Sequence, residues 1–414
     1  MTRSSNAGDG QAPDGAPVPD IDVVCLGESM VTFLPRLPGR LADVPSFDRA
    51  IGGAESNVAC TLARTGHTTR WISRVGTDGF GDHLLAAIAD CGVDVRHVRR
   101  DPLRPTGVYF RTAGDRATDT HEVAYYRAGS AASAMTVADL DPAALYSGRI
   151  LHLSGITAAL SADCLGLLTE LTTRRPGRPL LSFDVNYRPG LWRDTARARV
   201  LLDLARGADL VFVGDDEARD AWGLHGPRAI RQALPEPHTL VVKQGKAGAT
   251  VFRRTREPDG RCDDVTGTAG GHRGDVTGTA GGHRGDVTGT AGGHRDDVTR
   301  TAGGHRGDAT GTATFVPALD VDLVAATGAG DAFAAGFLSA TLRGLPDRAR
   351  LRHGHLWAAA ALTVPGDLAT PPSRPYADRL AALDDPAWER LHLAPGWTDA
   401  DTSGHRADEE VPTP

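Results

Sequence analysis

The sequence lacks the long apolar runs that membrane proteins need. No stretch of its 414 residues approaches the roughly 18 consecutive apolar residues of a membrane-spanning helix. Residues 1–20 are polar and contain no apolar core of the kind that a secretory signal requires. We therefore expect a protein that works in the cytoplasm and has no membrane partner.

Positive charge is not in excess either. The chain carries 45 Lys and Arg against 52 Asp and Glu, which gives a formal net charge of −7. Proteins that bind nucleic acids by neutralising phosphates present a basic face or stripe. The charge balance therefore predicts that the partner is not a nucleic acid.

Cysteine is scarce, and its spacing suggests no cross-link. The five cysteines are far apart and form no Cys-x-x-Cys pair, so the pattern indicates neither a disulfide framework nor a zinc site. Four of them are expected to be small buried residues, namely Cys25, Cys60, Cys91 and Cys164. Cys262 is the exception, because its surroundings are polar.

Glycine is abundant, and a repeat accounts for much of it. An 11-residue unit, DVTGTAGGHRG, recurs from Asp264 onward and offers one valine per unit, too little apolar surface for a stacked solenoid. We interpret residues 256–312 as a low-complexity insertion that is disordered or loosely ordered. Its glycine-rich spacers fix no metal geometry, which argues against a specific metal site at His272, His283, His294 and His305. Because long loops cost little free energy, deleting Asp264–Gly307 is expected to preserve activity.

The remaining chain alternates strand and helix patterns. With tails expected to be disordered at 1–20 and 396–414, residues 21–395 form one α/β domain. Short apolar segments such as ILHLSG, LLSFDVN, ADLVFVG and TLVVKQG are separated by helical patterns of ordinary length. This alternation predicts a mostly parallel sheet covered by helices on both faces. Segments of alternating polarity around 31–53 and 94–128 predict a separate small β lid.

One glycine-rich turn carries a chemical signal. Gly328, Ala329 and Gly330 directly precede an apolar helix that starts near Asp331. Backbone N–H groups of such a turn point at one spot, and the helix N-terminus adds partial positive charge. The segment therefore predicts an anion hole beside a carboxylate, although an aspartate at a helix start can also be a simple cap.

Several motifs together resemble the ribokinase (PfkB) family of carbohydrate kinases. ATGAGDAFAAGF (326–337) resembles the family's signature, and GGAESNVA (52–59) resembles its sugar-site motif. VVKQG (241–245) is similar to the nucleotide-side strand, and Glu217 to the acid near magnesium. The likeness covers nearly all of 21–372. It implies a ribokinase-like three-layer sandwich with a mostly parallel central sheet and a small β lid.

Within this family, four segments are similar to the 2-keto-3-deoxygluconate kinases: GESMVTFLP (27–35), TGVYF (106–110), YYRAGSAAS (125–133) and DVNYRPGLW (184–192). These residue types suit a sugar acid. A guanidinium offers a planar fork of donors to a carboxylate, which points to Arg127 and Arg188. Tyr109 and Tyr125 would supply amphipathic walls. Taken singly, each arginine can equally form an ion pair and each tyrosine can simply pack.

The resemblance also implies a set of roles around ATP and Mg²⁺. Asp331 would be the general base that accepts a proton from a primary hydroxyl of the sugar, and neighbouring amides would hold the γ-phosphoryl group. The full implied set is Asp331, Gly328, Ala329 and Gly330 for catalysis, Gly53, Asn57, Tyr109, Tyr125, Arg127 and Arg188 for the sugar, Lys243, Gly245, Gly248 and Asn186 for the nucleotide, and Glu217 for magnesium through water.

Two departures from the family pattern leave alternatives open. Ala325-Ala326 replaces the usual Asp-Thr, which argues against potassium activation, and Gly214 replaces an asparagine near the magnesium site. A kinase of a neutral sugar such as fructose or ribose therefore remains an alternative, as does a non-catalytic protein that binds sugar or nucleotide.

Exposed lid strands tend to pair, which suggests a homodimer.

Overall fold

The computed structural model describes residues 21–37, 39–112, 122–192, 198–254 and 311–399. Most of the predicted insertion (255–310), the tail 1–20 and residues 400–414 lie outside the described residues. Within the described part, no helix has the length and apolarity to cross a membrane. Two boundaries differ from the prediction. Thr312 belongs to a strand, and Trp397 is buried in a short 3-10 turn, η4 (Trp397–Asp399).

The central feature is an eight-stranded sheet with the order β14-β13-β12-β11-β10-β9-β1-β4. All neighbours from β12 to β4 run parallel, whereas β12, β13 and β14 pair antiparallel. The strands are β1 (Ile21–Leu26), β4 (Thr69–Ile72), β9 (Gly148–Ser154), β10 (Leu180–Asp184), β11 (Leu210–Gly214), β12 (Thr239–Lys243), β13 (Ala249–Arg253) and β14 (Thr312–Val316). The prediction of a mostly parallel sheet is confirmed.

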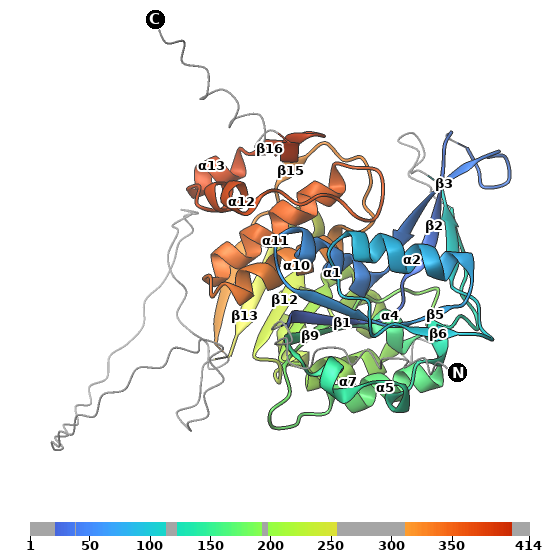
Figure 1. Cartoon of the computed structure of the whole chain (residues 1–414). Coiled ribbons are helices and arrows are strands. Elements are labelled where there is room, and N and C mark those ends of the chain that lie inside the picture. Colours follow the sequence, from blue (N-terminus) through green and yellow to red (C-terminus); the bar gives the residue numbers. More distant parts are fainter. Residues whose placement is uncertain (1–20, 38, 113–121, 193–197, 255–310, 400–414) are drawn as a thin grey trace, which may run out of the picture.

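Helices cover both faces of this sheet (Figure 1). One face carries α1 (Ala54–Arg64), α2 (Gly79–Asp90), α10 (Ala329–Leu342), α11 (Asp347–Leu362), α12 (Arg374–Ala381) and α13 (Asp385–Glu389). The other carries α3 (Pro142–Leu145), α4 (Gly155–Ala158), α5 (Ala162–Thr172), α7 (Val200–Gly207), α8 (Asp215–Trp222) and α9 (Pro227–Ala233). Alternate residues of one strand, such as Phe212 and Val213, enter opposite cores, which explains the continuous apolar runs.

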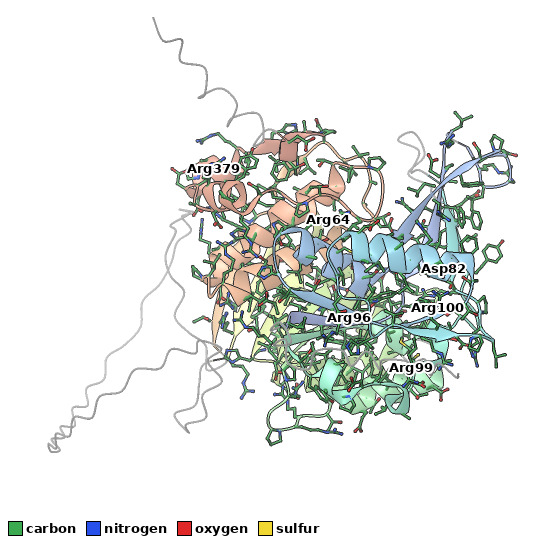
Figure 2. The ribbon with its side chains drawn as sticks, viewed as in Figure 1. Arg64, Asp82, Arg96, Arg99, Arg100 and Arg379 are labelled. Carbon is green, nitrogen blue, oxygen red and sulfur yellow. The ribbon has the colours of Figure 1, made fainter. Side chains whose placement is uncertain are left out.

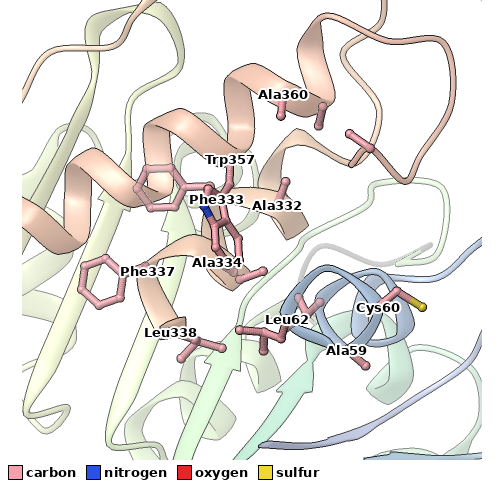
Figure 3. Packing of buried hydrophobic residues seen from close by; sticks show 14 of the residues in the cluster. Ala59, Cys60, Leu62, Ala332, Phe333, Ala334, Phe337, Leu338, Trp357 and Ala360 are labelled. Atoms are coloured by element: carbon pink, nitrogen blue, oxygen red, sulfur yellow. The ribbon is translucent and has the colours of Figure 1, made fainter. Parts of the chain in front are cut away.

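The core on the first face joins helices from the N-terminal and C-terminal parts of the chain. Leu62 of α1 packs in the same cluster as Phe333 and Leu338 of α10 and Trp357 of α11 (Figure 3). Helices α10 and α11 approach closely at Gly336, where a Cβ would lie 2.5 Å from the backbone oxygen of His353. The shared core with α1 holds the first turns of α1 and α10 side by side.

A second, four-stranded sheet has the order β3-β2-β7-β8 and projects from the domain (Figure 1). It consists of β2 (Met30–Pro35), β3 (Phe47–Gly52), β7 (Val108–Arg111) and β8 (Val123–Tyr126). Phe33 and Phe110 stack within it at 4.6 Å between ring centroids. This small sheet is the predicted β lid. Shorter pieces are β5 (Arg74–Gly76), β6 (Arg99–Asp101), β15 (Asp320–Val321), β16 (His392–Leu393), η1 (Ala132–Ala134), η2 (Val137–Asp139) and η3 (Gly245–Ala247).

Candidate active site

The glycine-rich turn is built as an anion-binding helix start. Gly328 caps α10 in the left-handed region, with φ 78°, a conformation that favours glycine. A Cβ at this position would also lie 2.1 Å from the backbone oxygen of Asp367. The N–H groups of the first helical turn have no intrahelical acceptor, so they are available to an anion.

Asp331 lies in this first turn and contacts the sugar-site motif. The side-chain amide of Asn57, on α1, donates a hydrogen bond of 2.9 Å to its Oδ2. Burial raises the pKa of Asp331 to about 7, the bond from Asn57 opposes this, and the negative charge of Asp184 adds to it. A carboxylate with a pKa near neutrality is suited to accept a proton.

The carboxyl ends of two strands bring charges to the same place. Lys243 ends β12 and Asp184 ends β10, and the Lys243 ammonium lies 3.0 Å from a carboxylate oxygen of Asp184. A Cβ on Gly330 would be 3.6 Å from that ammonium, so Lys243 lies beside the start of α10. Burial lowers the pKa of Lys243, but the charges of Asp184 and Glu217 outweigh burial and raise it.

Glu217 and the more exposed Arg188 extend this charge cluster. Glu217 Oε2 accepts a hydrogen bond of 2.9 Å from the backbone N–H of Gly214, and its Oε1 lies 3.5 Å from Arg188. Burial raises the pKa of Glu217, which the charge of Lys243 opposes. Arg188 is about half exposed and interacts with the charge of Asp331. The structure therefore groups Asp331, Asn57, Lys243, Glu217 and Arg188.

The residues here fit a magnesium ion held mainly through water and phosphate. The described residues contain no cluster of three or more side chains that could chelate a metal. Mg²⁺, however, commonly uses one or two carboxylates and keeps several waters. Asn186 has a buried Oδ1 with no partner and a positive φ of 41°, the one such non-glycine residue in the described part of the chain. Its backbone N–H donates a hydrogen bond of 3.2 Å to Asp184, and its free acceptor suits a hydrated cation.

The small sheet contributes a buried contact that the sequence did not predict. Tyr109, on β7, donates a hydrogen bond to one oxygen of Asp367, and Arg111 donates one of 2.8 Å to the other. Burial raises the pKa of Asp367, while the charge of Arg111 lowers it. Since the backbone of Asp367 lies against Gly328, this carboxylate ties the small sheet to the anion-binding turn.

Tyr125 lies directly opposite Tyr109 across β7 and β8, and Arg127 follows the last residue of β8. Arg127 forms a buried ion pair with Glu28, yet its Nε has no hydrogen-bond partner. Its guanidinium lies 5.8 Å from the centre of the Tyr125 ring, which is about half exposed and packs against Tyr109. Arg127 therefore already has a carboxylate partner, and the same holds for Arg188.

At three glycines of the implied site, the fold itself explains why the residue is glycine. A Cβ on Gly53 would lie 2.5 Å from the backbone oxygen of Glu28, and one on Gly248 would lie 2.2 Å from that of Val316. Gly245 adopts φ 56° in the turn between β12 and β13. Each position requires glycine for the fold, so glycine there does not by itself indicate a ligand contact.

The family follows from a match to a known sequence model. The model described as pfkB family carbohydrate kinase matches residues 20–270 and 304–374. The chain belongs to the pfkB family of carbohydrate kinases. Between the two matched ranges lie residues 271–303, the middle of the glycine-rich repeat. The ribokinase-like fold predicted from the motifs agrees with this assignment.

Named sugar kinases are among the relatives of this family member. A 2-dehydro-3-deoxygluconokinase of Bacillus subtilis (strain 168) is 31% identical over 86% of this chain and 93% of its own. One of Thermoproteus tenax is 34% identical over 56% of this chain and 72% of its own. A probable chloroplastic fructokinase of Arabidopsis thaliana is 28% identical over 88% and 82% of the two chains.

Solved structures share the fold over nearly their full length. A PfkB protein from Polaromonas sp. JS666 is 30% identical, with a TM-score of 0.65 over 87% of this chain and 99% of that one. A putative ribokinase II from E. coli, solved with ATP and Mg²⁺, is 20% identical, with a TM-score of 0.64 over 87% and 98%. The second likeness concerns the fold alone.

Sequence reasoning missed three acidic residues that hold the site together. Asp184 ends an apolar strand within a motif already noted, and its position at a carboxyl end was a usable signal. Glu28 also lies within a motif already noted, GESMVTFLP, whereas Asp367 lies in none, and their partners Arg127 and Arg111 are far away in the sequence. No local signal identified the partner of either residue.

Proposed function

We propose that this carbohydrate kinase transfers the γ-phosphoryl group of ATP to a primary hydroxyl of a sugar acid, with 2-keto-3-deoxygluconate as the acceptor. The observation that carries the proposal is the contact between Asn57 and Asp331 at the start of α10. It joins the sugar-site motif to a carboxylate whose pKa is raised to about 7. The two relatives named 2-dehydro-3-deoxygluconokinase support the choice of acceptor.

Asp331 acts as the general base in this mechanism. Its ionised carboxylate accepts the proton of the attacking hydroxyl, and the bond from Asn57 keeps Oδ2 oriented. The small sheet, held by the contacts of Tyr109 with Asp367, excludes water so that hydrolysis does not compete. General-base catalysis of this kind contributes about 10²- to 10⁴-fold.

The start of α10 stabilises the charge of the transferred group. The amides of Gly328, Ala329 and Gly330 are positioned without a helical acceptor, and Lys243 adds a positive charge beside Gly330. Such preorganised donors and charges supply most of the catalysis in phosphoryl transfer. Gly245 and Gly248 form the turn after Lys243, where the nucleotide would lie.

A bound Mg²⁺ would neutralise phosphate charge in this site. Glu217, through water, and the free Oδ1 of Asn186 are the groups that would hold it. Both lie within the charge cluster around Lys243 and Asp184. The E. coli neighbour solved with ATP and Mg²⁺ is a precedent on the same fold.

Arg127 and Arg188 would recognise the carboxylate of the acceptor. Arg127 has an unpartnered Nε beside the exposed Tyr125, and Arg188 is only loosely paired, at 3.5 Å from Glu217. A guanidinium has five N–H donors, so each arginine can bind a second carboxylate while keeping its first. Gly53 caps α1, and a Cβ on it would lie 2.5 Å from the backbone oxygen of Glu28, the partner of Arg127.

An acceptor screen with a matched pair of variants tests the proposal. In a coupled assay of ADP formation, we expect 2-keto-3-deoxygluconate to have a kcat/KM well above those of fructose and ribose. Asp331→Asn is expected to fold normally and to lose at least about 100-fold in kcat. Asp163→Asn changes an exposed aspartate in the first turn of α5 and is expected to keep full activity. Wild-type turnover by Asp331→Asn would contradict the base assignment.

A neutral-sugar kinase is the second candidate. Arg127 and Arg188 already pair with glutamates, and a probable fructokinase is among the relatives. In that case fructose or ribose is the preferred acceptor, and Arg188→Met leaves its KM unchanged. Preference for the sugar acid together with a raised KM in Arg188→Met would exclude this candidate.

We also propose that the chain forms a homodimer through its small sheet. Strand β8 is an edge of that sheet, and Tyr125 and Tyr126 on it are exposed by 52% and 66%. Unpaired strand edges with exposed apolar side chains favour pairing. Light scattering coupled to gel filtration is expected to give twice the chain mass, and a monomer mass would overturn the proposal.

A further inference from the structure

A cavity separate from the proposed active site lies between three segments of the chain. It has a volume of about 220 Å³ and is lined by residues within 72–74, 96–99 and 135–144. None of these lining residues belongs to the set proposed for the sugar, the nucleotide or magnesium. An engineered apolar cavity of about 150 Å³ binds benzene, and drug-sized ligands occupy about 300–1,000 Å³. The cavity therefore has the size for a small molecule whose body is about as large as one ring.

The inner wall of this cavity is apolar. Ile72, Met135 and Ala144 line it, and each is exposed by no more than 4% because it belongs to the core on the face covered by α5. Val98 and Leu140 also line the cavity and are partly exposed, so the apolar lining is not confined to buried residues. A ligand that places an apolar body here removes apolar surface from water, which favours binding.

Positive charge predominates among the side chains around the cavity. Its charged or titratable lining residues are Arg74, Arg96, His97, Arg99, Asp139 and Asp141. The carboxylate of Asp139 accepts two hydrogen bonds from Thr136 and one each from Arg74 and Arg99. A carboxylate offers about four acceptor positions, so most of the capacity of Asp139 is used. Asp141 caps α3 through a hydrogen bond of 3.0 Å from Ala143 and lies 3.8 Å from His97.

Two of the arginines retain donors for a ligand. Among the described residues, Arg99 donates to Asp139 through one nitrogen, and 55% of its side chain is exposed. Arg96 holds Asp94 with two of its nitrogens and is exposed by 71%. A guanidinium has five N–H donors, so each of these arginines can bind an anion while it keeps its present partner. Figure 2 shows Arg96 and Arg99 on the same side of the molecule.

We infer that this cavity is a binding site for a small organic anion that has an apolar body. The body lies on the inner wall, and a carboxylate or phosphate group binds to Arg99, with Arg96 and Arg74 adding positive charge. The planar fork of a guanidinium matches both kinds of anion. A cationic ligand would instead need a free carboxylate, and both aspartates of the lining already have hydrogen-bond donors.

Three probes of one size test the chemical class of the ligand. Phenyl phosphate and benzoate each combine an aromatic ring with an anionic group, and benzyl alcohol is the uncharged counterpart. In isothermal titration calorimetry on the full chain, we expect at least one of the two anions to bind about tenfold or more tightly than benzyl alcohol, because hydrogen bonds between charged groups are the strong ones. Absence of binding by both anions, or equal affinity for benzyl alcohol, overturns the inference.

Substitutions around the cavity test where the anion binds. Arg99→Met removes the main donor and is expected to weaken binding about tenfold. Arg100→Met is the matched control, because the neighbouring Arg100 pairs with Asp82 and does not line the cavity (Figure 2). Val98→Phe fills the cavity and is expected to abolish binding. If melting curves show that Val98→Phe does not fold, Leu140→Phe takes its place, because Leu140 lines the same cavity.

The variants also separate this site from the proposed active site. Phenyl phosphate that binds at the anion-binding turn of α10 would keep its affinity in Arg99→Met and in the cavity-filling variant. Binding that survives either substitution therefore overturns the inference, as does an equal loss in Arg100→Met. The measurement is of binding and not of turnover, so its result does not depend on which acceptor the kinase uses.

Discussion

At the scale of single residues, the environment of Asp331 determines how activity depends on pH. Its pKa is raised to about 7, and a general base works only when ionised. Activity is therefore lost as the pH falls through the pKa of the native protein. We expect kcat/KM to rise with pH, to level off above about pH 7 and to drop about tenfold per unit well below it.

Asn57 supplies a control for this assignment. Its hydrogen bond lowers the pKa of Asp331, so Asn57→Ala is expected to move the inflection of the profile to higher pH. The measurement is kcat/KM for the preferred acceptor across about pH 5 to 9, the range that brackets a pKa near neutrality. A profile that is flat in the wild type, or unchanged in Asn57→Ala, would contradict the role of Asp331.

Glu55 has a raised pKa that affects stability instead. It is fully buried on α1, and its Oε1 accepts hydrogen bonds from Ser154 and Thr157. Burial raises its pKa from 4.5 to about 7, so between these values the folded chain binds more protons than the unfolded one. This contribution to stability is complete below pH 4.5 and is lost as the pH rises toward 7.

The substitution Glu55→Gln removes this titration. We expect the free energy of unfolding of the variant to be less dependent on pH, so that its advantage over the wild type grows from about pH 4.5 to 7. Urea denaturation at several pH values measures it. Parallel stability curves for the two proteins would show that Glu55 stays ionised in the native state.

At the scale of elements, the link between the small sheet and α10 depends on Asp367. Its carboxylate holds Tyr109 and Arg111 of β7, and its backbone lies on Gly328. Asp367→Asn removes a charge-assisted bond worth about 1.5–3 kcal/mol. We expect the KM of the sugar to rise about tenfold or more, because 1.4 kcal/mol is a factor of ten in affinity, with a smaller change in kcat.

Asp320→Asn is the matched control, because Asp320 is an exposed aspartate of β15 that pairs with His392. It is expected to leave both constants unchanged. Thermal unfolding of Asp367→Asn separates the two possible roles. A lower melting temperature with an unchanged KM would show that Asp367 serves only the fold.

The sequence predicted the elements better than the contacts between them. Apolar strands separated by helices required a parallel sheet, and Gly328 followed by Gly330 before an apolar helix required an anion-binding turn. The partner of a charge is decided by packing between elements, which a single sequence does not encode locally. Asp367 lies 256 residues from Arg111, and the pairing of Arg127 with Glu28 was likewise not predictable.

At the scale of the whole molecule, the insertion enters far from the proposed site. Arg253 pairs with Thr312 across β13 and β14, and Arg253 also lies opposite Thr239, at the start of β12. Lys243 lies at the opposite end of β12, its carboxyl end. Adjacent antiparallel strands can be joined by a short turn.

We therefore expect the chain to tolerate replacement of residues 255–310 by Asn-Gly. Activity and melting temperature are expected to stay near those of the full chain, because the closure entropy of a loop grows only with the logarithm of its length. A Gly-Ser linker of the original length is the control that separates length from sequence. Loss of folding or of ATP affinity in both chains would show that the repeat has a role of its own.

The contact between Asn57 and Asp331 joins residues 274 positions apart, which matters while the protein is being made. The helices α10 and α11 help to complete the apolar core over β1 and β12, yet they follow residues 255–310 in the chain and leave the ribosome after both strands. Translation proceeds at about 5–20 residues per second, so residues 255–310 postpone that event by roughly 3 to 11 seconds. During this interval the nascent sheet presents an uncovered apolar face, and chaperones are the natural agents to shield it.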